Sequence, residues 1–400
     1  MPLLCEAAMR KLYTLVCAVL VCVPIALSVS LSAHGAPAII PSPPGIAASG
    51  YILIDANSGR VIVEHNADEQ LPPASLTKLM TSYVLSYELE NGNVSNKDWV
   101  NISENAWAQN PVFAGSSLMW IEVGKKVLLE DLHKGVVISS GNDASVAVAE
   151  HLAGSESAFA EVMNHHAQLL GMDSSNFVNS HGLPDPQHYM TARDLATLSG
   201  AIIKFPKEYA LYSEPDFTYN SIRQSNRNRL LWKDDSVDGL KTGHTEAAGY
   251  CLVTSAKKGG MRLISVVMGA SSQSSRERET QKLLAYGFRY YETHQLYSAG
   301  DELTESALWA GVSDSFTLGV ADDVVLTVPR GQLKSLKAVM NIDEVISAPV
   351  IKGVEYGEMV ISLHGEELLR HPLVATVDVA EGGLFKRLWH SIILFFNQLF

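Results

Sequence analysis

The sequence predicts an α/β (α+β) domain with an antiparallel sheet and a helical subdomain, followed by a small all-β domain and a C-terminal amphipathic helix. Three observations support this fold class. Apolar runs flank a turn near residue 57 and another near residue 259, as in antiparallel hairpins. Between these turns, apolar residues recur mostly at three- and four-residue steps, which is typical of helices. After about residue 298, short apolar runs are separated by Gly, Pro and Asp, which indicates an all-β domain.

The composition limits the classes of partner. The chain has 400 residues, enough for two or three domains, and a formal net charge of −13. Nucleic-acid binding needs clustered Lys and Arg, and the sequence has no long basic run. We therefore expect no nucleic-acid partner and favour small-molecule, peptide or glycan partners.

Residues 1–36 predict a secretory signal peptide. Arg10 and Lys11 precede the apolar run 12–31, and small residues follow it. We expect cleavage within residues 33–38. An uncleaved anchor helix is the alternative, because the run is long. In both cases the rest of the chain is exported.

Cysteine usage indicates a fold without disulfides. Cys5, Cys17 and Cys22 lie in the predicted signal peptide, which leaves Cys251 alone in the exported part. One thiol cannot form an internal disulfide. Because Cys251 lies in an apolar run, we expect it to be a buried, unreactive side chain.

Residues 37–297 are predicted to form the first domain, which begins with a Pro-rich linker. Two apolar runs flank Asn57-Ser58-Gly59, which predicts a hairpin. The region from about 105 to 205 is expected to be mostly helical. Helices are predicted from Leu76 to about residue 90 and at 143–153, 158–170, 193–203 and 279–292, and strands at 51–55, 60–64, 249–256 and 262–270.

Residues 298–381 are predicted to form the small all-β domain. Its apolar runs are 315–318, 324–328, 336–340, 359–363 and 373–379.

Residues 382–400 predict an amphipathic helix that follows a Gly382-Gly383 hinge. Bulky apolar residues make one broad face, and Lys386 and Arg387 belong to a narrow polar face. This pattern suits a helix that lies in a membrane interface, and it is too interrupted for a spanning helix. Docking on the protein's own core is the alternative.

Ser75 and Lys78 are the first candidate catalytic residues. At a helix start, positions i and i+3 lie on one face, so the hydroxyl and the amine can meet. Lys can activate a serine if its pKa falls from about 10.4 toward roughly 7–8. Alone this motif is weak, because Ser255-Ala256-Lys257-Lys258 also fits it and because Ser75 would also suit an N-cap.

Two further motifs strengthen the hypothesis. Ser140-Gly141-Asn142 follows an apolar run and precedes a predicted helix, and Lys241-Thr242-Gly243 precedes the two later strands. Ser140 would pass a proton to a leaving amine, and Asn142 would hold Lys78. The charge of Lys241 would lower the pKa of Lys78. Ser174-Ser175-Asn176 matches the second motif by chance.

In this order the motifs resemble the S-x-x-K, S-D-N and K-T-G signature of penicillin-binding proteins and class A β-lactamases, with Gly141 in place of the Asp. The chain is similar to the low-molecular-mass penicillin-binding proteins, specifically exported D-alanyl-D-alanine carboxypeptidases. The likeness covers nearly the whole chain and includes the segments 132–144, 226–232 and 238–245. It implies a transpeptidase/β-lactamase-like catalytic domain that acts on the peptidoglycan stem peptide. It also implies covalent inhibition by β-lactam antibiotics and peripheral attachment to the outer face of the cytoplasmic membrane.

The resemblance also implies residue roles. Ser75 attacks the carbonyl of the penultimate D-Ala, Lys78 is the general base, Ser140 relays the proton and Asn142 orients Lys78 and the substrate. The backbone N–H groups of Ser75 and His244 hold the oxyanion.

The same resemblance implies that the Lys241-Thr242-Gly243 run and Arg276 recognise the terminal carboxylate of the substrate. Arg278 is an alternative to Arg276, and a surface salt bridge is a third possibility for this segment. Arg227 would attract the carboxylate or have a structural role.

Three histidines are not assigned catalytic roles. His165 and His166 are adjacent and point apart on a helix, without metal-ligand spacing. His181 is expected to shape a turn that flanks the site. We expect no metal and no cofactor.

Three other activities use similar residues. A β-lactamase of class A carries an added Glu for deacylation, and no Glu-x-x-Leu-Asn run lies between the second and third motifs. A D,D-endopeptidase would use the same residues, so the sequence leaves it open. A non-catalytic sensor of β-lactams or wall peptide would usually be coupled to a spanning helix and a cytoplasmic output domain, and we predict neither here. A β domain that binds the wall or a partner is a fourth alternative, and it is compatible with catalysis.

Overall fold

The computed structural model describes residues 40–397, so the predicted signal peptide lies outside the described residues. The central feature is a five-stranded antiparallel sheet with the strand order β2-β1-β9-β8-β7. The first two strands of the chain form the predicted hairpin. The strands are β1 (Gly50–Asp55), β2 (Val61–His65), β7 (Val237–Thr245), β8 (Gly249–Lys258) and β9 (Met261–Ala270).

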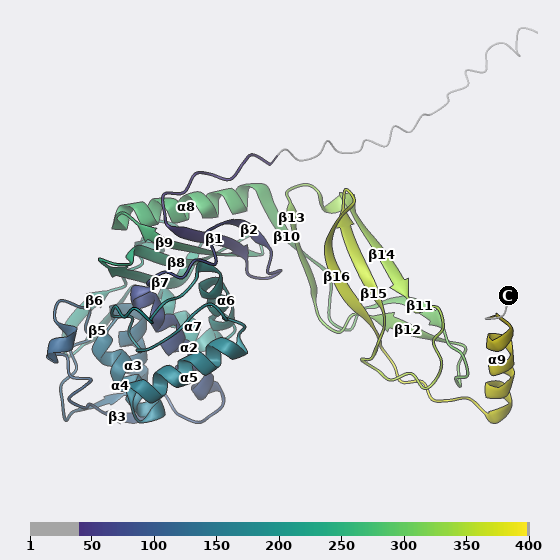
Figure 1. The fold of residues 1–400 in the computed structure, drawn as a ribbon, viewed down its shortest axis with the longest axis horizontal. Coiled ribbons are helices and arrows are strands. Elements are labelled where there is room, and N and C mark those ends of the chain that lie inside the picture. Colours follow the sequence, from purple (N-terminus) through teal and green to yellow (C-terminus); the bar gives the residue numbers. More distant parts are fainter. Residues whose placement is uncertain (1–39, 398–400) are drawn as a thin grey trace, which may run out of the picture. The chain divides into compact units, whose positions relative to one another are not determined.

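Helices cover both faces of this sheet (Figure 1). On one face α8 (Gln273–Tyr290) packs Leu283 and Leu284 against the strands. On the other face a larger core joins the sheet to the helical subdomain. That subdomain contains α2 (Lys78–Glu90), α3 (Leu129–Lys134), α4 (Asn142–Ala153), α5 (Glu156–Leu169), α6 (Ala192–Ile202) and α7 (Pro206–Tyr209).

The prediction of a mostly helical region from 105 to 205 is wrong for its first part. Residues 102–125 form a long loop between β3 (Trp99–Asn101) and β4 (Lys126–Leu128), with only one short 3-10 turn. Pro111, Gly115 and Gly124 interrupt any helical repeat there. A second small hairpin, β5 (Asp216–Tyr219) with β6 (Ile222–Ser225), was not predicted.

Helix α8 begins six residues before its predicted start. Ser272 is its N-cap, and the Ser272 hydroxyl accepts a hydrogen bond from the Ser275 N–H at 3.1 Å. The first turn is polar, so it carries no apolar periodicity.

The C-terminal strands form a five-stranded antiparallel sheet in the order β11-β12-β16-β15-β14, and β10 pairs with β13. Four of the five predicted runs lie in β12 to β15. The fifth predicted run, 373–379, overlaps β16 only at residues 373–375, because the first half of that strand is rich in charged residues and largely exposed. The strands are β10 (Tyr291–Tyr297), β11 (Glu302–Ala307), β12 (Ser315–Gly319), β13 (Val324–Pro329), β14 (Leu336–Ile342), β15 (Glu355–Leu363) and β16 (Glu366–Ala375).

Helix α9 (Leu384–Asn397) matches the predicted amphipathic helix, and its large apolar side chains are exposed. Phe385 is 93% exposed and Trp389 is 63% exposed. None of the helices within residues 40–397 has the length and apolar character needed to cross a membrane.

Candidate active site

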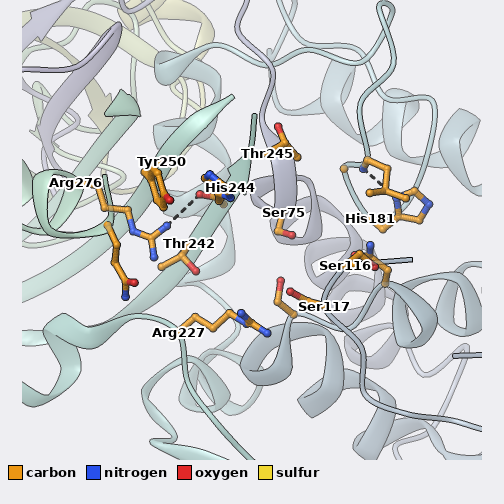
Figure 2. Close-up of a pocket in the computed structure, with 17 residues that line it drawn as sticks. Ser75, Ser116, Ser117, His181, Arg227, Thr242, His244, Thr245, Tyr250 and Arg276 are labelled. Carbon is orange, nitrogen blue, oxygen red and sulfur yellow. Dashed lines mark hydrogen bonds between the residues drawn. The ribbon is translucent and has the colours of Figure 1, made fainter. Parts of the chain in front are cut away.

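The nucleophile candidate lies where the chain enters α2. Residues Ala74–Thr77 form a 3-10 turn (η1), and α2 begins at Lys78. Ser75 lines a cavity of about 300 Å³ that opens between the sheet and the helical subdomain. In Figure 2 it lies between a group that contains Thr242 and Arg276 and a group that contains Ser116 and His181.

Lys78 is 1% exposed and makes three contacts through its amine. Nζ lies 3.1 Å from Ser75 Oγ, 2.7 Å from Asn142 Oδ1 and 2.6 Å from the backbone oxygen of His181. The last two groups only accept hydrogen bonds, so they take up the two N–H groups of a neutral amine. The lone pair of that amine then faces the Ser75 hydroxyl.

Burial lowers the pKa of Lys78 to about 7. Asp143 and Glu156 oppose this shift, and the Arg227 guanidinium adds to it. Burial, rather than the charge of Lys241 that we expected from the sequence, is the main cause. Lys78 therefore has the basicity of a general base near neutral pH.

The second motif lies at the start of α4, opposite Lys78. Ser140 follows a π-helical turn, Gly135–Ser139, and has a left-handed backbone with φ of 60°. Its Oγ accepts a hydrogen bond from Lys241 Nζ at 2.9 Å. Because the lysine supplies this bond, the Ser140 proton is free to be donated to another group.

The third motif is on β7, a strand that the sequence did not reveal. Lys241 is 3% exposed, and Thr242, Gly243 and His244 line the cavity. Burial, followed by the charges of Lys78, Arg227 and Arg276, lowers the pKa of Lys241 well below its usual value.

Arg276 reaches the cavity from α8, and Arg278 does not line it. One Arg276 Nη donates to the backbone oxygens of Gly243 at 3.1 Å and Cys251 at 3.4 Å, and the guanidinium lies over the Tyr250 ring. Its Nε is buried without a partner. Arg278 instead pairs with Glu279 at 3.1 Å.

Arg227 also lines the cavity, and its Nε donates to the Ser139 backbone oxygen at 3.4 Å. The site thus has guanidinium groups from two elements, which suits a substrate that ends in a carboxylate.

Asp143 supports the site and was not singled out in the sequence. Its carboxylate accepts hydrogen bonds from the N–H groups of Met119 and Trp120 at 2.8 Å and of Ile121 at 3.2 Å. These bonds hold the end of the 102–125 loop, whose Ser116 and Ser117 line the cavity. The sequence signal that could have pointed to this role is the position of Asp143, which follows Asn142 directly.

His181 does more than shape a turn beside the site, because it also contacts Lys78. Its backbone oxygen accepts from Lys78, and its ring faces Glu156 at 3.3 Å. A backbone contribution of this kind leaves no side-chain signature in a sequence.

The decoy motifs lie away from the cavity. The Ser255 hydroxyl accepts from Arg262 at 2.6 Å, and Lys257 and Lys258 are exposed. Ser175 donates to Asp194 at 2.7 Å. Neither run contributes a residue to the cavity lining.

Two other groups that the sequence singled out lie away from the cavity. His166 packs against Tyr83 and Tyr87. Among residues 40–397, no group of three or more His, Cys, Asp or Glu side chains is placed to hold a metal ion. Cys251 is buried, as predicted, and burial raises the pKa of its thiol to about 11, which disfavours the reactive thiolate at neutral pH.

Comparisons with known proteins identify the family of this chain. A family model described as D-alanyl-D-alanine carboxypeptidase matches residues 38–272, and one described as the C-terminal domain of penicillin-binding protein 5 matches residues 291–381. D-alanyl-D-alanine carboxypeptidase DacA of Escherichia coli K12 is 46% identical over 367 residues, which are 90% of this chain and 91% of that protein. DacF of Bacillus subtilis is 35% identical over 343 residues, 84% of this chain and 87% of that protein.

Solved structures lead to the same family. The structure of penicillin binding protein 5 from Haemophilus influenzae has a TM-score of 0.83 and 44% identity, and covers 85% of this chain and 100% of its own. The predicted resemblance and the fold class are both confirmed by these matches. The chain belongs to the D-alanyl-D-alanine carboxypeptidase family of serine peptidases.

Proposed function

We propose that this enzyme removes the C-terminal D-Ala from the peptidoglycan pentapeptide through an acyl-enzyme on Ser75. The observation that carries this proposal is the placement of the Lys78 amine between Ser75 Oγ, Asn142 Oδ1 and the His181 backbone oxygen. A buried amine with a pKa of about 7, next to a serine hydroxyl, is the arrangement that nucleophilic catalysis requires.

In the acylation step, Lys78 accepts the Ser75 proton while Oγ attacks the carbonyl of the penultimate D-Ala. The developing oxyanion is held by the backbone N–H groups of Ser75 and His244. The C–N bond breaks as Ser140 donates a proton to the departing amine, and free D-Ala leaves. Ser140 then recovers its proton from Lys78.

In the deacylation step, Lys78 removes a proton from water, which attacks the ester carbonyl. The Ser75–acyl bond breaks, and Ser75 Oγ recovers the proton that Lys78 took from the water.

Before acylation, Lys241, Thr242 and Arg276 bind the terminal carboxylate of the incoming peptide. A β-lactam acylates Ser75 in the same way, but its amine stays tethered to the acyl group.

The test is release of D-Ala from a soluble peptide that ends in D-Ala-D-Ala, with the parent chain and its Ser75→Ala variant. Release by the parent and none by the variant supports the proposal. A folded parent that is acylated by penicillin but releases no D-Ala would instead favour an endopeptidase or a sensor.

We also propose that the exported protein attaches peripherally to the outer face of the cytoplasmic membrane through α9, beyond a catalytic domain at 37–297 and a β domain at 298–381. The exposed side chains of Leu384, Phe385 and Trp389 support this. Removal of residues 382–400 should release the protein from lipid vesicles and leave turnover of soluble peptide unchanged. If the truncated protein still sedimented with vesicles, the helix would not be the anchor.

A further inference from the structure

A buried histidine outside the three motifs contacts the turn that carries the nucleophile. His188 is 4% exposed, and its Nε2 lies 2.7 Å from the Thr77 hydroxyl. The same hydroxyl donates to the Ala74 backbone oxygen at 2.9 Å. Neither His188 nor Thr77 lines the cavity.

The direction of these hydrogen bonds follows from the histidine's other nitrogen. His188 Nδ1 accepts from the Val178 N–H at 3.1 Å, so Nδ1 carries no proton. In the neutral ring the proton is then on Nε2, which donates to Thr77 Oγ1. Burial lowers the pKa of His188 to about 4, with Asp185 raising it and Lys78 lowering it, so the ring is neutral at pH 7.

The Thr77 hydroxyl has one proton, which it donates in a hydrogen bond to the Ala74 backbone oxygen. The three hydrogen bonds therefore all donate in the same direction, from the Val178 N–H through His188 and Thr77 to the Ala74 carbonyl. The Phe177 ring lies edge-on to the His188 ring, with centroids 5.8 Å apart, and holds it in place.

Ala74 needs this support because of its backbone. Its φ is +48°, a conformation that non-glycine residues rarely adopt. The carbonyl that Thr77 holds belongs to the same peptide unit as the Ser75 N–H. Because a peptide unit is planar and trans, a fixed Ala74 oxygen fixes the direction of the Ser75 N–H on the opposite side.

We propose that His188 is a positioning residue, which acts through Thr77 and the Ala74 carbonyl to aim the Ser75 N–H at the developing oxyanion. The inference rests on the proposed function of Ser75. It predicts a loss in the transition state rather than in substrate binding, because the oxyanion forms only during attack.

The test measures kcat and KM for D-Ala release, together with the rate of acylation by a fluorescent penicillin. Thr77→Val keeps the side-chain shape but removes both hydrogen bonds. We expect its kcat to fall about 10-fold or more, with KM within about 2-fold of the parent. Thr77→Ser keeps the hydroxyl and should recover most of the lost kcat.

His188→Phe should lower kcat by a similar factor, and the double variant should lose no more than the larger single loss. His188→Gln keeps an N–H donor and should recover part of the activity. If His188→Phe does not fold, the two Thr77 variants decide the question alone.

Ser86→Ala is the matched control. Ser86 is also buried on α2, and its hydroxyl donates to the Ser82 backbone oxygen at 2.7 Å, away from the cavity. The change removes a buried hydroxyl and its hydrogen bond, so it should lower the melting temperature and leave kcat near the parent value. Parent-like kcat in Thr77→Val, an equal kcat loss in Ser86→Ala, or additive losses in the double variant would each overturn the inference. An inactive parent would instead refute the proposed function.

Discussion

The Lys78 amine lies 3.1 Å from the Ser75 hydroxyl, inside a site that keeps the amine almost fully out of water. Acylation needs the neutral amine, and burial lowers the pKa of Lys78 to about 7. The second-order rate of acylation by a fluorescent penicillin should therefore rise between pH 6 and 8, with a midpoint near 7. Lys78→Arg should lower this rate about 100-fold or more, because Arg stays protonated. A flat rate from pH 6 to 8 would contradict this role.

Asp143→Asn should destabilise the loop that borders the cavity. The carboxylate accepts N–H groups from Met119, Trp120 and Ile121, and an amide would turn an N–H₂ group toward some of them. Each hydrogen bond to a charged group contributes about 1.5–3 kcal/mol, so we expect the free energy of unfolding to fall by at least about 2 kcal/mol. Urea unfolding measures this loss. Glu130→Gln on α3, where the carboxylate is exposed, should change stability by less than about 0.5 kcal/mol.

Buried histidines make stability depend on pH in the acid range. Burial lowers the pKa of His133 and His188 to about 4 and that of His181 to about 3, against 6.5 in model compounds. Below pH 6.5 the unfolded chain binds protons that the folded chain does not, so this stability is complete above pH 6.5 and is lost as the pH falls toward 4. We expect the urea midpoint to fall steadily from pH 7 to pH 4.5. His133→Asn should make the fall shallower, and an unchanged midpoint at pH 5 would refute the expectation.

Gly182→Ala should disable the nucleophile. Gly182 has φ of +85°, and a Cβ there would lie 1.9 Å from the Ala74 oxygen. We expect acylation to fall about 100-fold or more in any folded protein. Gly154→Ala is the control, because Gly154 has a similar φ of +80° but open space around it. It should cost about 1 kcal/mol of stability and keep the parent acylation rate. Equal effects of the two variants would show that backbone strain alone is responsible.

The parts of the site that the sequence predicts are those with a local geometric rule. Ser75 and Lys78 are three residues apart at a helix start, so their meeting follows from helix geometry. Ser140 and Asn142 stand at the start of α4, where an apolar run ends. These positions need no knowledge of distant segments.

The parts that the sequence does not reveal depend on contacts between distant segments. Strand β7 carries two glycines and polar residues that face the cavity, so its alternation is hidden. The 102–125 loop keeps its course because the Asp143 carboxylate binds its backbone. The His181 oxygen acts through the main chain, for which any residue type would serve.

The residues that line the cavity all lie between Ser75 and Arg276. The strands from β10 onward and helix α9 contribute none of them. Catalysis and the membrane attachment that we propose for α9 therefore depend on separate parts of the chain. A substitution after residue 290 changes none of the residues that line the cavity.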